Sequence, residues 1–65
     1  MTKLSPRQKQ ICLMVVRGIS TKEIAMSLGI SPRTVEDHRC SILARYEVNN
    51  VVQLVRKVYK IEDAA

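Results

Sequence analysis

The chain has 65 residues, of which 46% are hydrophobic, and eleven Lys and Arg stand against six Asp and Glu for a net charge of +5. This length allows one domain that buries about 60% of its unfolded surface, which excludes a Rossmann unit, a barrel or a walled catalytic cleft, and the apolar content excludes intrinsic disorder. The basic excess favours a polyanionic partner, nucleic acid first and an anionic membrane surface second.

Two helices are predicted in the first half of the chain, each with its own start and stop signals. The first, over residues 6–17, begins at Ser5–Gln8, which combines a Ser cap, Pro at the first helical position and Gln three residues after the cap. Gly18 is well placed to end it. The second, over residues 21–28, opens with the capping box Ser20–Glu23. Both helices carry apolar residues at helical spacing.

Two more helices are predicted in the second half. The third, over residues 32–45, again starts with a Ser cap, Ser31, followed by Pro. The fourth, over residues 50–60, is capped by Asn49 or Asn50. A strand in this last segment would have no partner strand elsewhere in the chain. The sequence therefore predicts an all-α, four-helix fold forming one domain over residues 1–65.

The turn between the second and third helices indicates a helix-turn-helix. Leu28–Ser31 is a short turn centred on Gly29, which permits the positive φ that a tight turn requires. Ala25 is small where the two helices would cross, and Val35 fits the wedge between them. A generic αα-hairpin uses similar residues, but this register together with the basic charge favours DNA binding.

With these features the chain resembles the LuxR-type (GerE- or FixJ-type) C-terminal DNA-binding domain of bacterial transcription regulators. The resemblance extends from Leu4 to Val58. The residues that carry it are Leu4–Arg7, Gly18–Ala25, Leu28–Ser31, Thr34, Val35, His38, Ile42, Leu43, Val48, Leu54 and Val55. It implies a tetrahelical helix-turn-helix whose third helix, Pro32–Arg45, enters the major groove, and a fourth helix that forms a dimer contact.

Resemblance and helical geometry together select the expected DNA-binding residues. Four share the groove-facing side of the third helix at i, i+3, i+4 and i+7 spacing, opposite its apolar side. They are Arg33, Glu36, Asp37 and Cys40. Six others suit phosphate oxygens, through hydroxyls and backbone N–H groups at helix N-termini or through cationic side chains. They are Thr21, Lys22, Ser31, Thr34, Arg39 and Arg45.

Three acidic residues depart from the family pattern. Glu36 and Asp37 place two carboxylates on a surface that should face phosphates. They either accept hydrogen bonds from cytosine N4 or are held by Arg33 and Arg39 at i,i+4 and i,i+3 spacing. Glu47 stands where a glycine is usual, and a left-handed backbone there would cost about 1 kcal/mol or more.

Catalytic, metal and cofactor sites are not expected. His38 is the only histidine, and we expect it to be packed and hydrogen-bonded near the core edge. Cys12 and Cys40 lack zinc-ligand spacing. A redox switch between them is conceivable, but a core filler at Cys12 and a tolerated exposed thiol at Cys40 are the simpler interpretation. The chain is interpreted as a non-enzymatic domain.

The fourth helix is apolar on more than one face. Val52, Arg56 and Tyr59 lie beside its core stripe, which predicts a weak homodimer contact. The leading hypothesis is sequence-specific binding of double-stranded DNA by the effector domain of a cytoplasmic transcription regulator. The alternatives are a protein-interaction module of the same fold that contacts RNA polymerase or a sensor domain, and a sigma-factor-like DNA-binding fragment. No apolar run approaches the length of a membrane span, and no apolar segment follows Met1 as in a signal peptide.

Overall fold

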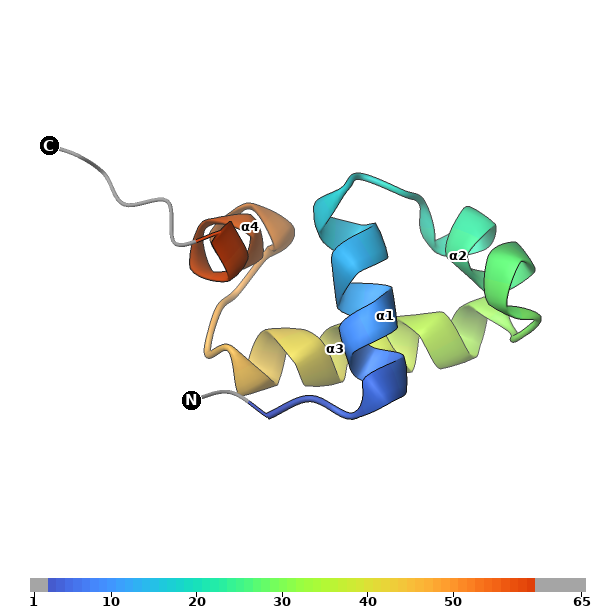
Figure 1. Cartoon of the computed structure of the whole chain (residues 1–65), viewed down its shortest axis with the longest axis horizontal. Coiled ribbons are helices and arrows are strands. Elements are labelled where there is room, and N and C mark those ends of the chain that lie inside the picture. The colour runs from blue at the N-terminus through green and yellow to red at the C-terminus, as the bar shows by residue number, and fades with distance from the viewer. Residues whose placement is uncertain (1–2, 60–65) are drawn as a thin grey trace, which may run out of the picture.

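The computed structural model describes residues 3–59, and all of the regular structure in this range is helical (Figure 1). In chain order the helices are α1 (Pro6–Val16), α2 (Thr21–Leu28), α3 (Pro32–Arg45) and α4 (Val51–Tyr59). The predicted all-α, four-helix fold is confirmed. Helix α3 packs against α1 and α2, and α1 also packs against α4. In Figure 1, α2 and α4 lie toward opposite ends of α3, with α1 crossing it between them.

Side-chain caps begin the helices, as the sequence predicts. The hydroxyls of Ser5, Ser20 and Ser31 each accept a hydrogen bond from the backbone N–H three residues on, at 3.1, 3.2 and 3.1 Å. The box at Ser5 is complete, but the one at Ser20 is half-formed. Glu23 accepts from the Ser20 hydroxyl at 3.2 Å rather than from its backbone N–H. Asn50 caps α4 through its Oδ1, which lies 2.9 Å from the Gln53 N–H.

Left-handed residues follow the first three helices. Gly18 (φ 84°) and Gly29 (φ 67°) adopt this conformation after α1 and α2, and Glu47 (φ 56°) adopts it after α3. Two hydrogen bonds close the end of α3: the Glu47 N–H donates to Ala44 O and the Val48 N–H to Leu43 O, both at 3.0 Å. This is a Schellman motif with glutamate in the usual glycine position. The cost of about 1 kcal/mol or more that is expected for a left-handed backbone at Glu47 therefore applies.

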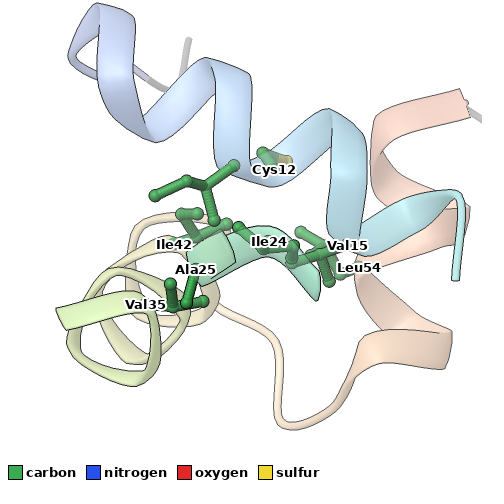
Figure 2. Close-up of a cluster of buried hydrophobic side chains, with 8 residues drawn as sticks. Cys12, Val15, Ile24, Ala25, Val35, Ile42 and Leu54 are labelled. Atoms are coloured by element: carbon green, nitrogen blue, oxygen red, sulfur yellow. The ribbon is translucent and has the colours of Figure 1, made fainter. Parts of the chain in front are cut away.

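Eight buried apolar side chains among residues 3–59 form the core, and all four helices contribute. Figure 2 shows the side chains it labels converging from the four helices. The set is Ile11, Cys12 and Val15 from α1, Ile24 and Ala25 from α2, Val35 and Ile42 from α3, and Leu54 from α4. No polar or charged residue among residues 3–59 is buried. Burial of each large aliphatic side chain stabilises the fold by about 1.5–3 kcal/mol, and the single buried residue of α4 gives that helix the smallest share.

Candidate nucleic-acid interface

Helices α2 and α3 are joined by a tight turn that sets their relative position. The N–H groups of Gly29 and Ile30 both converge on the carbonyl oxygen of Ala25, and the Ile30 bond measures 3.0 Å. The positive φ of Gly29 makes this convergence possible. Ala25 is 3% exposed and belongs to the same core cluster as Val35 of α3, so its small side chain lets the two helices approach closely.

The outer side of α3 carries the four residues expected to face DNA bases. Val35 and Ile42 are buried against the rest of the protein, which turns the opposite side of the helix outward. All four residues on that side are exposed: Arg33, Glu36, Asp37 and Cys40. The structure thus gathers them on one accessible surface, where polar groups could meet the edges of bases.

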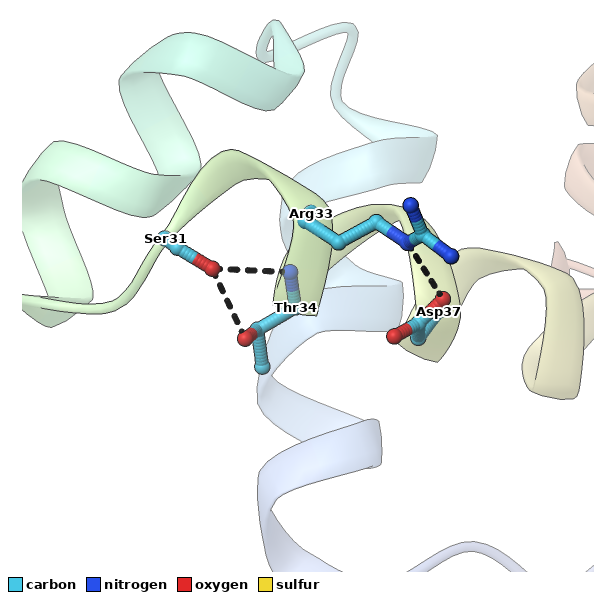
Figure 3. Close-up of polar contacts among 4 residues, drawn as sticks. All are labelled: Ser31, Arg33, Thr34 and Asp37. Atoms are coloured by element: carbon cyan, nitrogen blue, oxygen red, sulfur yellow. Dashed lines mark hydrogen bonds and ion pairs between the residues drawn. The ribbon is translucent and has the colours of Figure 1, made fainter.

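Asp37 is paired with Arg33 on this surface (Figure 3). Arg33 Nε donates to Asp37 Oδ1 at 3.4 Å, one helical turn away, and the two side chains are 86% and 69% exposed. The expected i,i+4 interaction therefore forms. Exposed pairs of this kind stabilise a helix by only about 0.3–0.5 kcal/mol. A nucleic acid could replace this pair with its own contacts at little expense.

Glu36 has a different partner from the one expected. Its carboxylate oxygen Oε2 accepts a hydrogen bond from the Thr21 hydroxyl at 2.9 Å, so the first residue of α2 is linked to the second turn of α3. No ion pair between Glu36 and Arg39 occurs in the described chain, and the i,i+3 pairing hypothesis for them is wrong. The sequence held no local signal for this contact, because its partners are 15 residues apart and meet only when α2 packs on α3.

The N-terminus of α3 is held by a small hydroxyl network. Ser31 Oγ accepts from the Thr34 N–H at 3.1 Å and lies 2.9 Å from Thr34 Oγ1 (Figure 3). Both residues are exposed, as is Lys22 in the first turn of α2. The Lys22 side chain forms no hydrogen bond or ion pair with another residue in the 3–59 range. Its ammonium group is therefore available to an external anion.

Two arginines that are expected to reach phosphates, Arg39 and Arg45, also contact other parts of the domain. Arg39 is half-buried. It lines a cavity of about 10 Å³ together with Val15, Ile42, Leu43, Val51 and Leu54. Arg45 Nη1 donates to the backbone carbonyl of Lys3 at 2.9 Å, which ties the end of α3 to the segment before α1. Guanidinium groups carry five donors, so this contact leaves others for phosphates.

The two thiols and the histidine belong to no candidate metal cluster within residues 3–59. No group of three or more His, Cys, Asp or Glu residues within the described range could hold a metal ion. Cys12 is buried and desolvation raises the pKa of its thiol, whereas Cys40 is exposed. His38 is half-buried as expected, but the expected hydrogen bond to it is absent among the described residues.

The residues expected at a dimer contact are on the accessible side of α4. Val52 is 66% exposed and Tyr59 is 52% exposed, so both apolar side chains are open to solvent. Arg56 lies between them and is exposed as well.

None of the helices in the described part has the length and apolar character needed to cross a membrane.

Known bacterial regulators are similar in sequence to this chain. A family model described as bacterial regulatory proteins, luxR family, matches residues 2–58. The transcriptional regulatory protein FixJ of Rhizobium meliloti (strain 1021) is 45% identical over 53 residues, which are 82% of this chain and 26% of the relative. The transcriptional regulatory protein UhpA of Escherichia coli (strain K12) is 38% identical over 56 residues, 86% of this chain and 29% of the relative.

A third relative extends the match. The response regulator protein TodT of Pseudomonas putida is 36% identical over 61 residues, which are 94% of this chain and 27% of the relative. The chain thus spans less than a third of the length of each of these relatives. The family match covers almost the whole chain and includes the turn and helix α3 described above. The chain therefore belongs to the luxR family of bacterial regulatory proteins, whose helix-turn-helix domains bind DNA in transcription regulation.

Proposed function

We propose that this chain binds double-stranded DNA sequence-specifically, as the effector domain of a transcription regulator, with α3 in the major groove. One observation carries the proposal: helix α3, which follows the tight turn after α2, has an outer side that is exposed and polar. A major groove about 12 Å wide admits one α-helix. The proposal assigns the domain no catalytic role or cofactor.

Phosphate contacts would provide most of the affinity. The net charge of +5 attracts the duplex, and residues 1–22 hold five basic and no acidic residues. Lys22 supports this role best, because its ammonium is exposed at the start of α2. The remaining phosphate-contact residues in the proposal are Ser31, Thr34, Arg39 and Arg45, whereas the Thr21 hydroxyl already donates to Glu36. Base contacts are assigned to Arg33, Glu36, Asp37 and Cys40.

Partners beyond DNA are part of the same proposal. Exposed Val52 and Tyr59, with Arg56, support a weak homodimer through α4. Contact with RNA polymerase would fit a regulator bound near a promoter, and DNA as the ligand places the protein in the cytoplasm. Because the relatives are about three times as long as this chain, control of this domain is assigned to segments outside it.

A titration against salt tests the DNA-binding proposal. Affinity for a duplex selected from random DNA should fall on a log–log plot with a slope of about −0.9 per phosphate contact. Lys22→Ala should weaken binding to all duplexes alike and make the slope shallower by about 0.9. Lys57→Ala is the matched control, because it removes the same charge from an exposed position on α4. A flat salt response, or no binding at low salt, would contradict the proposal.

That negative result would favour a second candidate, a protein-interaction module of the same fold. The pair of carboxylates on α3, Glu36 and Asp37, is the observation in its favour, because acidic groups oppose a phosphate-lined groove. Both carboxylates have intramolecular donors, Thr21 and Arg33, and this weakens the objection to DNA. RNA polymerase or a sensor domain would then be the partner to test.

A further inference from the structure

The hydrogen bond between Thr21 and Glu36 joins the two helices of the helix-turn-helix on its exposed side. We propose that the Thr21 hydroxyl positions the Glu36 carboxylate to accept a hydrogen bond from the exocyclic amino group of a cytosine in the major groove. This inference rests on the proposed DNA-binding function and specifies what one part of the interface recognises.

The hydroxyl proton of Thr21 is already used. A threonine hydroxyl has one proton to donate, and here the Thr21 hydroxyl donates it to Glu36 Oε2, which lies 2.9 Å from the hydroxyl oxygen. A phosphate at Thr21 would lose that donor and would also approach the negative carboxylate. The geometry therefore favours a positioning role for Thr21 over the phosphate contact predicted from the sequence.

Within residues 3–59, no group other than Thr21 orients the Glu36 side chain. The guanidinium of Arg33 is turned to Asp37, and Arg39 is not paired with Glu36. Thr21, by contrast, is half-buried in the first turn of α2, directly after the Ser20 cap. Its hydroxyl thus offers a fixed point for one carboxylate oxygen. The other oxygen, Oε1, has no partner within residues 3–59 and is left to meet a ligand.

The chemistry of that oxygen selects its ligand. An ionised carboxylate only accepts hydrogen bonds, so it matches amino groups and opposes the acceptors of guanine and thymine. Adenine presents its N6 amino group beside the N7 acceptor, which would face the carboxylate with like polarity. Cytosine presents only its N4 amino group in the major groove. Cytosine is therefore the base that fits.

The test compares base preference in three variants. Selection from random DNA with the wild-type chain and with Glu36→Ala identifies the position whose preference depends on Glu36. At this position the wild type should prefer cytosine over thymine by about tenfold, a typical discrimination for one specific contact. Thr21→Val, which keeps the branched shape and removes the hydroxyl, should reduce the preference to about threefold or less. Thr21→Ser should retain it.

A double-mutant cycle separates positioning from independent effects. In the Glu36→Ala background, Thr21→Val should change the preference no further, because nothing remains to be positioned. Thr21→Ala provides a second removal of the hydroxyl, and circular dichroism melts verify that each variant is folded. Neither hydroxyl-free variant should change the salt slope.

Three results would overturn the inference. If Thr21→Val weakens all duplexes equally and makes the salt slope shallower, Thr21 is a phosphate contact. If Glu36→Ala leaves the base preference intact, or if the affected position prefers a base other than cytosine, Glu36 does not read cytosine. These failures all leave salt-dependent DNA binding in place, whereas failure of the proposed function removes salt-dependent binding to every duplex.

Discussion

Among residues 3–59, Glu47 is the one residue other than glycine that has a positive φ. It has a φ of 56° in the Schellman motif that ends α3. A side chain in the left-handed region costs about 1–2 kcal/mol, and glycine avoids this penalty but adds freedom to the unfolded chain. Glu47→Gly should therefore raise the free energy of unfolding by about 1 kcal/mol, measured by urea denaturation.

Gly18 provides the reverse control for this prediction. It has a φ of 84°, and a Cβ added there would meet no atom within 4 Å. Gly18→Ala thus introduces backbone strain without a steric clash and should lower the free energy of unfolding by about 1 kcal/mol. If Glu47→Gly instead destabilises the protein, contacts of the glutamate side chain outweigh the strain.

Burial of Cys12 and Tyr46 predicts a loss of stability in alkali. Desolvation raises the pKa of the Cys12 thiol above its ordinary 9.0, and it also raises that of the Tyr46 phenol above 10.0. The unfolded state then loses these protons first, so stability is complete below about pH 9 and falls as pH rises through the folded-state pKa values. Urea midpoints from pH 7 to 11 measure this decline.

Substitutions at the two cysteines show which thiol is responsible. Cys12→Ala should flatten the alkaline decline, although it also lowers stability at every pH by removing a core side chain. Cys40→Ala is the matched control, because it removes a thiol that is exposed rather than buried. An equally steep decline in the absence of Cys12 would assign the effect to Tyr46 and other groups.

At this scale, local contacts were predictable and distant ones were not. The caps at Ser5 and Ser31 follow from residues three positions apart, so the sequence alone indicates them. The Arg33–Asp37 pair follows in the same way from one helical turn. The bond between Thr21 and Glu36 depends on how α2 crosses α3, and no pattern within either helix encodes that crossing.

Helix α4 begins at a side-chain cap and contributes one buried residue to the core. Asn50 Oδ1 accepts the Gln53 N–H at 2.9 Å, and the helix buries only Leu54. Asn50→Ala should therefore lower the free energy of unfolding by about 1 kcal/mol, measured by thermal or urea denaturation. Because α4 packs mainly on α1, hydrogen exchange should increase in α4 more than in α2 or α3.

Asn49→Ala is the matched control for this cap. The neighbouring Asn49 engages Gln53 through its backbone N–H, which donates to Oε1 at 2.9 Å and survives the substitution. The Asn49 variant should keep wild-type stability within about 0.5 kcal/mol. Equal losses in the two variants would show that the asparagines act through the loop rather than through the cap.

Helix positions could be predicted from the sequence because their signals are local. Packing between helices was harder to predict, because it depends on residues that are far apart in the chain. The sequence placed the first helix at residues 6–17, and the structure ends it at Val16 with Arg17 as the cap. Arg39 illustrates the limit. Its helical position is readable from the sequence, but its place beside Leu54 and Val51 arises only when α1, α3 and α4 meet.

At the scale of the whole molecule, the proposed functions are assigned to separate regions. Helices α2 and α4 lie toward opposite ends of α3 (Figure 1), so the surface around Thr21 and Glu36 is separate from the one around Val52 and Tyr59. Helix α4 also has a single fully buried residue, Leu54. Changes on the outer face of α4 should consequently affect assembly on DNA without altering base recognition.

Val52→Asp tests that separation. Val52 is 66% exposed, so a carboxylate there should not disturb the core, but it would place two like charges at a symmetric α4 contact. On a duplex with two half-sites about 10 bp apart, the wild type should bind cooperatively and the variant should not. On a duplex with one half-site, the two proteins should bind equally.

Moving the half-sites apart by about 5 bp should abolish wild-type cooperativity, because it turns the second site to the opposite side of the helix. Cooperative binding that survives both changes would show that α4 is not the dimer contact.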